Sequence, residues 1–277
     1  MKKMNGKNKG KLLVHIILII GSIWMIFPFF WMILTSFKTF SETTRIPPVI
    51  FPKSFSFANY NTVFLTLPFK QFYINTIVTS FTVTIGQIIV STMAAYVFAR
   101  LKFPGNKILF FIVLSVMMVP TQIFIIPQYM TMKYLHLLDS LPALIIPGWF
   151  SAFSVFLLRQ FFMTLPIELE EAARIEGCGT FKIFYSIMLP LAKPGIVAAS
   201  IFSILWSWND LMWPLIVNNS MEKMTLAAGL ASLQGQHLTN YPVIMAGAFL
   251  AVLPMLIIFL IFQKQFVEGI ALSGTKA

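Results

Sequence analysis

The chain has 277 residues, of which 58% are hydrophobic and only 10% are charged, and its mean hydropathy is +0.83. A water-soluble protein averages about 25% charged residues, so no fold in water could bury this much apolar surface. The single cysteine, Cys178, excludes an intrachain disulfide and a cysteine-based metal cluster, and the three histidines are scattered along the chain. The formal net charge of +11 is compatible with either a nucleic-acid partner or an asymmetric membrane topology.

The first predicted element is the apolar run that follows a lysine-rich N-terminus. A secretory signal peptide has an apolar core of about 7–15 residues and ends at a cleavage site of small residues. Here the apolar run continues through Trp31 to Leu34. We therefore interpret it as a retained membrane span.

Five further stretches along the chain are apolar over roughly the length needed to cross the hydrocarbon core of a bilayer. An even number of spans places both termini on the same side of the membrane. The six predicted spans are 12–36, 72–98, 108–130, 140–162, 196–217 and 241–263.

Lysine and arginine are distributed unequally between the two sets of loops that these spans define. The set with both termini and the 163–195 loop carries 14 of these residues, and the opposite set carries six. The positive-inside rule therefore predicts a basic cytoplasmic tail over 1–11, a six-span domain over 12–263 and a cytoplasmic tail over 264–277. Topology and contact with anionic membrane lipid account for most of the basic excess, so nucleic acid is not expected as a partner.

The 163–195 loop is predicted to begin with a short helix. Pro166 suits the first helical turn, and the carboxylates after it lie near the positive end of the helix dipole. Glu170 and Arg174 have the spacing and order of a favourable i,i+4 pair. Gly177 predicts a left-handed C-terminal cap, so the helix should stop there.

A second helix is predicted after this turn, with Thr180 as its N-cap. Its apolar positions have helical spacing and should share one face: Phe181, Phe184, Tyr185 and Met188. Such a helix–turn–helix fits the docking of a partner protein. It also fits an amphipathic segment that only anchors the loop on the membrane surface, and the residue pattern alone leaves both readings open.

The residue order in this loop resembles the EAA loop in membrane subunits of bacterial ABC importers. That pattern is Glu-Ala-Ala, three residues, Gly, nine residues and Ile-x-Leu-Pro. The chain matches its seven defined positions with Glu171-Ala172-Ala173, Gly177 and Ile187-Met188-Leu189-Pro190. Cys178 stands where the family commonly has alanine.

Two other stretches resemble signatures of carbohydrate-importer permeases of the maltose and glycerol-3-phosphate branch. They are SWNDLMWPL at 207–215 and FQKQFVEGIALSGTKA at 262–277. The chain ends in Lys276-Ala277, where Lys-Gly is usual in the family. Six spans instead of eight match the smaller permease of such a pair.

The resemblance implies an all-α integral membrane protein with the fold of type I ABC importers, resident in the bacterial plasma membrane. Its implied function is uptake of a sugar, oligosaccharide or related polyol by alternating access. Its implied partners are a second permease in a heterodimer, two ATP-binding cassette subunits and an extracytoplasmic solute-binding protein. Docking to the ATPase is then expected of the coupling loop, 163–195, through Glu171, Ala172, Ala173, Arg174, Gly177 and Phe184.

No cofactor is expected on this chain. It lacks the Gly-x-x-x-x-Gly-Lys-Ser/Thr loop that cradles phosphates, so ATP and magnesium should bind the partner ATPase subunits. The chain is accordingly expected to be a non-catalytic subunit rather than an enzyme, since it also offers no cluster of catalytic side chains.

Asp210 is the only acidic residue inside a predicted span. Such a group usually faces a cavity or the interior of a helix bundle, but Asp210 could equally lie at headgroup level within an aromatic belt. Asn75 and Gln87 could line a polar route, although hydrogen bonding between helices is the commoner role of such residues in membranes. The pathway candidates are Asp210, Asn209, Asn75, Gln87 and Trp206.

An ion-coupled secondary transporter, which works without an ATPase, is the alternative function. Proton relays normally need several ionisable residues within the spans. This chain offers only Asp210 and the peripheral His15, which favours the importer.

Overall fold

The computed structural model describes residues 6–234 and 239–274, and every regular element within those ranges is a helix or helical turn. The chain divides into two compact units, one formed by 1–67 with 230–253 and the other by 68–229 with 254–277. The first five residues of the predicted basic tail lie outside the described residues, as do His237 and Lys276-Ala277. The all-helical prediction is confirmed for the described part of the chain.

Four apolar helical segments in the described residues are long enough to cross a membrane. They are Lys11–Ser36 within α1 (Gly6–Ser36), α4 (Phe69–Arg100), Leu141–Thr164, and Tyr241–Gln263 within α15 (Tyr241–Gly274). The third comprises α7 (Leu141–Ile145), η3 (Ile146–Trp149) and α8 (Ala152–Thr164). Two bent helix pairs, one over 106–134 and one over 180–208, could each add one span, which gives four to six candidate spans within the described residues.

The stretch predicted as the span 108–130 is a bent pair rather than one straight helix. Its first arm contains α5 (Asn106–Ser115) and η1 (Val116–Met118), and its second contains η2 (Thr121–Phe124) and α6 (Ile125–Tyr134). The two arms meet at 99°. Pro120 stands at the bend and disfavours the helical conformation in Val119, whose φ of −93° and ψ of 126° are extended.

The predicted span 196–217 is also interrupted. α12 (Lys193–Trp208) ends before Asn209, and the shorter α13 (Met212–Val217) follows after three residues. η5 (Met221–Lys223) and α14 (Leu226–Ala231) then lead toward α15. The interruption falls at Asp210, the acidic residue singled out above.

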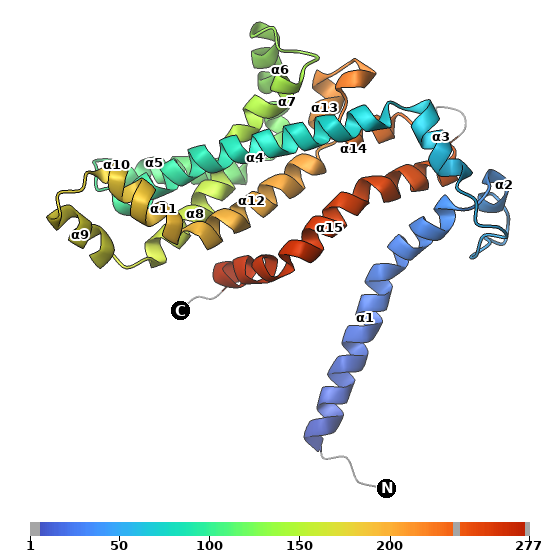
Figure 1. The fold of residues 1–277 in the computed structure, drawn as a ribbon, viewed down its shortest axis with the longest axis horizontal. Coiled ribbons are helices and arrows are strands. Elements are labelled where there is room, and N and C mark those ends of the chain that lie inside the picture. Colours follow the sequence, from blue (N-terminus) through green and yellow to red (C-terminus); the bar gives the residue numbers. More distant parts are fainter. Residues whose placement is uncertain (1–5, 235–238, 275–277) are drawn as a thin grey trace. The chain divides into compact units, whose positions relative to one another are not determined.

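The larger unit is built around α4, with α8 and α12 packed along it (Figure 1). Small residues allow these helices to approach closely. A Cβ on Gly86 of α4 would overlap the indole of Trp149, and a Cβ on Gly195 of α12 would lie 2.8 Å from the ring of Phe161 on α8. The helix backbones therefore pack where larger side chains would hold them apart.

The 163–195 loop folds as the predicted helix–turn–helix at one end of α4 (Figure 1). Its elements are α9 (Glu168–Ile175), α10 (Thr180–Ile183), the π-helical turn η4 (Phe184–Met188) and α11 (Leu189–Leu191). Their buried side chains share one apolar cluster with α4, α8 and α12: Ala95, Tyr96, Leu158, Phe162, Ala173, Ile183, Met188, Ala192 and Ala199. The loop is thus part of the core of this unit.

The smaller unit joins the end of α1 to a loop that carries α2 (Phe40–Thr43) and α3 (Ala58–Thr66). The amide of Asn59 donates to the backbone oxygens of Ser36 and Lys38, at 2.8 Å each, and the hydroxyls of Ser36 and Tyr60 lie 2.7 Å apart. The most apolar part of α1 has no residue buried within the chain. That surface is therefore available to lipid or to another membrane subunit.

Candidate functional site

The first helix of the loop ends as the sequence predicts, at a glycine in the left-handed conformation. Gly177 has a φ of +83°. Its N–H donates to the oxygen of Arg174 at 3.0 Å, and the N–H of Cys178 donates to the oxygen of Ala173 at 2.9 Å. These two bonds are the Schellman motif, which satisfies the last carbonyls of a helix. A Cβ on Gly177 would have no neighbour within 4 Å in this chain, so lack of space is not the reason for glycine here. The reason is the left-handed backbone conformation, which residues with a Cβ rarely adopt.

The expected docking residues lie on two different faces of α9. Ala173 is 5% exposed and belongs to the apolar cluster, whereas Glu171, Ala172, Arg174 and Gly177 are exposed. Of this group, the side chain of Ala173 therefore packs inside the chain and the other four remain available to a partner. A docking role for these residues stays a prediction.

Glu170 does not make the ion pair predicted from its spacing with Arg174. It is 3% exposed, and its Oε1 lies 3.1 Å from Nε of Arg100, at the end of α4. The two atoms are at ion-pair distance but are not aligned as a hydrogen bond. The hydroxyl of Tyr96 donates to Oε2 of Glu170 at 3.4 Å. The prediction was wrong because Glu170 pairs with the buried side chain of Arg100, which is distant in the sequence, and not with the exposed Arg174 four residues away.

The second half of the loop differs from its prediction in two respects. Gly179 occupies the N-cap of α10, with no side-chain cap, so Thr180 is the first helical residue. The π-helical turn then shifts the buried face, because residues five apart align in a π-helix. Ile183 and Met188 are therefore fully buried, while Phe181 and Tyr185 are 74% and 65% exposed.

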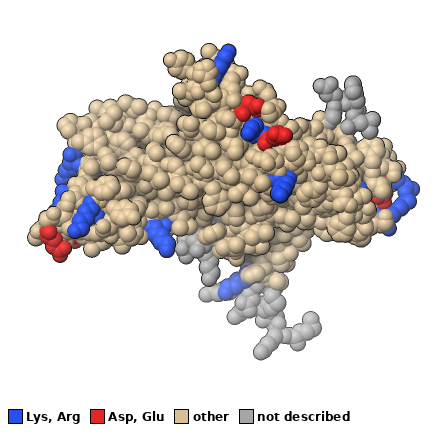
Figure 2. Space-filling model, turned by 45° about the horizontal axis from the view of Figure 1, so that its top comes forward, with Lys and Arg blue, Asp and Glu red and all other residues tan. Residues whose placement is uncertain are grey.

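Phe184, the remaining docking candidate, lies between these extremes. It is partly buried and its ring centroid is 5.0 Å from that of Tyr96. The loop consequently exposes apolar groups beside its charged ones, with Ile175 at 88% exposure. Figure 2 shows acidic and basic side chains together at the end of the larger unit that carries α9. This mixture of charged and apolar groups is typical of a protein interface.

Gln87, a pathway candidate, is occupied by hydrogen bonds between helices. It is 4% exposed, and its Nε2 donates to the Oγ of Ser154 on α8 at 2.6 Å. The Oγ of Ser203 on α12 donates to Oε1 of Gln87 at 3.1 Å, and Thr84 donates to Ser203 at 3.1 Å. Gln87 thus joins three helices, which is the commoner of the two roles considered from the sequence.

Asn75 has a similar part at the opposite end of α4 from the loop. Its Nδ2 donates to the backbone oxygens of Glu222 and Met224, at 2.7 and 2.8 Å, and its Oδ1 accepts from Gln71 at 2.9 Å. Asn75 is 1% exposed. It holds η5 and the residue that follows it, Met224, against α4.

Trp206, Asn209 and Asp210 lie together in sequence at the break after α12. Trp206 is 52% exposed and its ring centroid is 5.2 Å from that of Phe153. Asn209 is exposed and donates to the oxygen of Leu205, and Oδ1 of Asp210 accepts from the N–H of Trp213 at 3.3 Å. Asp210 therefore supports the start of α13 while its side chain stays partly exposed. These three remain candidates for contact with a substrate.

Sequence reasoning missed Asp139, which orders the segment after α13. Its carboxylate accepts from the N–H groups of Asn219 and Ser220, at 3.0 and 2.9 Å, and from the Ser220 hydroxyl. These hydrogen bonds, led by that from the hydroxyl, lower the pKa of Asp139 below its usual value. Asp139 also has a φ of +55°, which aspartate tolerates better than most residues. Only this local turn preference could have marked it in the sequence.

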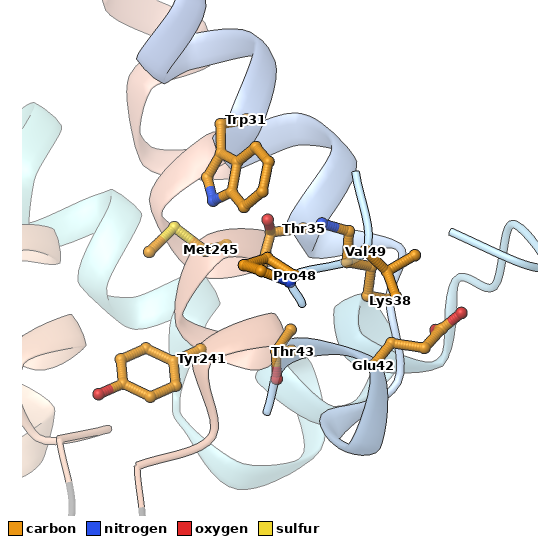
Figure 3. Close-up of a pocket in the computed structure, with 9 residues that line it drawn as sticks. All are labelled: Trp31, Thr35, Lys38, Glu42, Thr43, Pro48, Val49, Tyr241 and Met245. Atoms are coloured by element: carbon orange, nitrogen blue, oxygen red, sulfur yellow. The ribbon is translucent and has the colours of Figure 1, made fainter. Parts of the chain in front are cut away.

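The smaller unit contains a cavity of about 250 Å³, which Figure 3 shows. Lys38 is 2% exposed there, its Nζ lies 4.2 Å from the ring centroid of Trp31, and burial lowers its pKa. Thr35 has a buried hydroxyl without a hydrogen-bond partner. The carboxylate of Glu42 accepts from the backbone N–H groups of Thr39 and Lys53. The lining residues are Trp31, Thr35, Lys38, Glu42, Thr43, Pro48, Val49, Tyr241 and Met245.

Within the described residues, no three histidine, cysteine or acidic side chains are grouped so that they could hold a metal ion. The polar clusters described above are instead made of amides, hydroxyls and single ion pairs. Such groups are suited to hydrogen bonding and to charged contacts with a partner.

Comparison with known proteins agrees with this architecture. Residues 87–271 match the family described as "Binding-protein-dependent transport system inner membrane component". The chain is 40% identical to the arabinooligosaccharides transport system permease protein AraQ of Bacillus subtilis (strain 168), over 92% of each protein. It is 32% identical to the sn-glycerol-3-phosphate transport system permease protein UgpE of Pectobacterium atrosepticum, over 92% of this chain and 94% of that protein.

One similar solved structure comes from a bacterial ABC transporter involved in the import of the acidic polysaccharide alginate. The TM-score is 0.81 at 22% sequence identity, over 96% of this chain and 100% of the other. The two chains therefore share a fold. With the family match spanning 87–271 and relatives that align along nearly its whole length, this chain belongs to the inner membrane components of binding-protein-dependent transport systems.

Proposed function

We propose that this chain is the permease subunit of an ATP-driven importer for an oligosaccharide or a related polyol, in the bacterial plasma membrane. It crosses the membrane six times, with the bent pair over 106–134 counted as one span and the segment 196–217 as another, and both termini and the 163–195 loop lie in the cytoplasm. A second permease, two ATP-binding cassette subunits and an extracytoplasmic binding protein complete the transporter. The subunit itself is not catalytic.

The observation that carries this proposal is the form of the loop. α9 is closed by a Schellman motif and held on the core by Ala173 and Glu170, while Glu171, Ala172 and Arg174 remain exposed. A short helix with a fixed base and a free charged face can transmit a displacement of a docked partner into the membrane helices. A helix that only anchored the loop on lipid would turn a continuous apolar face toward the membrane, whereas the exposed face of α9 carries Glu171, Ala172 and Arg174.

Substitutions on the exposed face test the docking role. Glu171→Lys reverses a charge at the proposed joint, and Gly177→Asp places a side chain where the backbone is left-handed. Both variants should insert into the membrane and lose the ATPase subunits on purification. Glu222→Lys is the matched control, because Glu222 is also an exposed carboxylate but lies outside the loop. Retention of the ATPase subunits by both docking variants would refute the assignment.

The break after α12 is the proposed place of substrate contact. Trp206 offers an exposed aromatic surface, and Asn209 and Asp210 offer polar groups within four residues of it. Sugars bind through such combinations, since their C–H faces pack on aromatic rings and their hydroxyls form hydrogen bonds. Gln87 and Asn75 are assigned to the scaffold, because their polar atoms are already paired.

The substrate class rests on the relatives. AraQ is named for arabinooligosaccharides and UgpE for sn-glycerol-3-phosphate, and the higher identity to AraQ favours an oligosaccharide. Proteoliposomes that contain the whole transporter and its binding protein should take up radiolabelled arabinooligosaccharides only when ATP is supplied inside. ATP-independent uptake driven by an ion gradient would instead identify a secondary transporter.

A further inference from the structure

We infer that Glu170, Arg100 and Tyr96 are positioning residues that fasten the coupling loop to α4, so that α9 and α4 move as one body. This inference rests on the proposed function, in which the loop receives the motion of the ATPase subunits. It names the three residues through which that motion reaches the membrane helices, and it names α4 as the helix that receives the motion.

The contact between the loop and α4 is buried and charged. The side chains of Arg100 and Glu170 are 8% and 4% exposed, and their Nε and Oε1 atoms lie 3.1 Å apart. The other oxygen of Glu170 accepts from Tyr96, one helical turn before Arg100. Because both oxygens of Glu170 face α4, the base of α9 has one favoured position on the end of that helix.

The rest of the loop is attached to the same turn of α4. The Nη2 of Arg100 donates to the backbone oxygen of Leu165, just before α9. The ring of Tyr96 packs against Phe162 and Phe184, with centroid distances of 5.8 and 5.0 Å. Residues before, within and after α9 are therefore all held by two side chains of α4.

At its opposite end α4 holds a different segment of the chain. Asn75 donates to the oxygens of Glu222 and Met224, and the hydroxyl of Thr76 accepts from the N–H of Leu226 at 2.8 Å. A helix of 32 residues spans about 48 Å. α4 thus links the coupling loop to the segment that, in the proposed topology, faces the binding protein.

Stability alone does not require this ion pair. Replacing a buried pair with apolar side chains of similar volume is often neutral or stabilising, whereas removing one partner leaves an uncompensated charge. The pair fixes one position and orientation of α9 on α4, which an apolar contact fixes less sharply. A positioning role therefore predicts that an apolar double substitution keeps the fold and loses the transmission of motion.

Spin labels can measure whether α9 and α4 move together. The background is Cys178→Ala, with Met93→Cys on the exposed side of α4 and Glu176→Cys at the end of α9. The label-to-label distance is measured in the assembled transporter in nanodiscs, without nucleotide and after trapping with ATP and vanadate. One narrow distribution, unchanged between the two states, is expected for the unmodified contact.

Two substitutions then break the contact in different ways. Glu170→Gln leaves Arg100 charged, and Arg100→Met with Glu170→Leu removes both charges. In each variant the label-to-label distance distribution should become broader. A fluorescent label at the exposed Asn219 reports the opposite end of α4, and its response to ATP should fall about tenfold in both variants while ATP hydrolysis continues. Glu168→Gln, on the same helix, should leave both measurements unchanged.

The outcomes separate this inference from the proposed function. Loss of folded protein would lower hydrolysis and the Asn219 response together, whereas loss of positioning lowers only the response. If the apolar double variant keeps the narrow distribution and the response, the pair is merely structural and the inference fails. If the wild-type chain binds no ATPase, the proposed function fails, and the Met93–Glu176 distance in the chain alone still tests the contact.

Discussion

The cap of α9 allows a quantitative prediction with a matched control. Gly177 has a φ of +83°, and Gly179, two residues later, has a φ of −72°; neither would bring a new Cβ within 4 Å of another atom. Gly177→Ala therefore introduces backbone strain without a clash, which costs about 1–2 kcal/mol in the left-handed region. Alanine also stiffens the unfolded chain, which offsets roughly half of this cost. The net loss of loop stability is therefore about 1 kcal/mol. Gly179→Ala should be close to neutral, because stiffening of the unfolded chain offsets the lower preference of alanine for the N-cap of α10.

The single cysteine provides the assay, because Cys178 lies between these glycines and packs against the apolar cluster. Local opening of the loop exposes its thiol, so the maleimide labelling rate in detergent reports the opening equilibrium. Gly177→Ala should raise this rate about fivefold relative to wild type, which corresponds to about 1 kcal/mol. Equal rates for the two alanine variants would refute the argument that Gly177 is required for its backbone conformation.

Three other predictions concern separate sites. Gln87→Leu should destabilise the larger unit by about 1 kcal/mol in detergent unfolding, because Ser154 loses its hydrogen-bond donor and Ser203 loses its acceptor. Hydrogen bonds from the backbone of Thr39 and Lys53 lower the pKa of Glu42, so its stabilising effect is present above the usual carboxyl pKa and is lost as the pH falls through the lowered value. Thermal unfolding between pH 7 and pH 3 should show this loss in wild type and less of it in Glu42→Gln. Asp210→Asn should reduce ATP-driven uptake while the complex still assembles, and unchanged uptake kinetics would remove Asp210 from the pathway.

Local features of the chain could be predicted from the sequence. The stop of α9 at Gly177 depends on neighbouring residues only, and the structure confirms it with two hydrogen bonds. Apolar segments of adequate length also predicted the four long helical spans. In each case the determining interactions lie within one element or between the element and lipid.

Features that depend on tertiary contacts could not be predicted in this way. Glu170 is paired with Arg100, which lies 70 positions earlier in the sequence. Met188 is buried as predicted, but the π-helical turn buries Ile183 with it in place of Phe181 and Tyr185, because packing on α4 and α8 overrides the regular helical period. The bend at Pro120 could not be predicted either, because composition alone does not distinguish a tolerated proline in a span from a broken span.

Site-directed cross-linking tests the central claim, that the exposed face of α9 docks an ATPase subunit. In a Cys178→Ala background, Ala172→Cys places a thiol on the exposed face, and Ala173→Cys places one on the buried face of the same helix. With a bifunctional thiol reagent and the assembled transporter, we predict a cross-link to the ATPase subunit from position 172 and none from position 173. The absence of any cross-link from position 172, with the subunits still bound, would contradict the account.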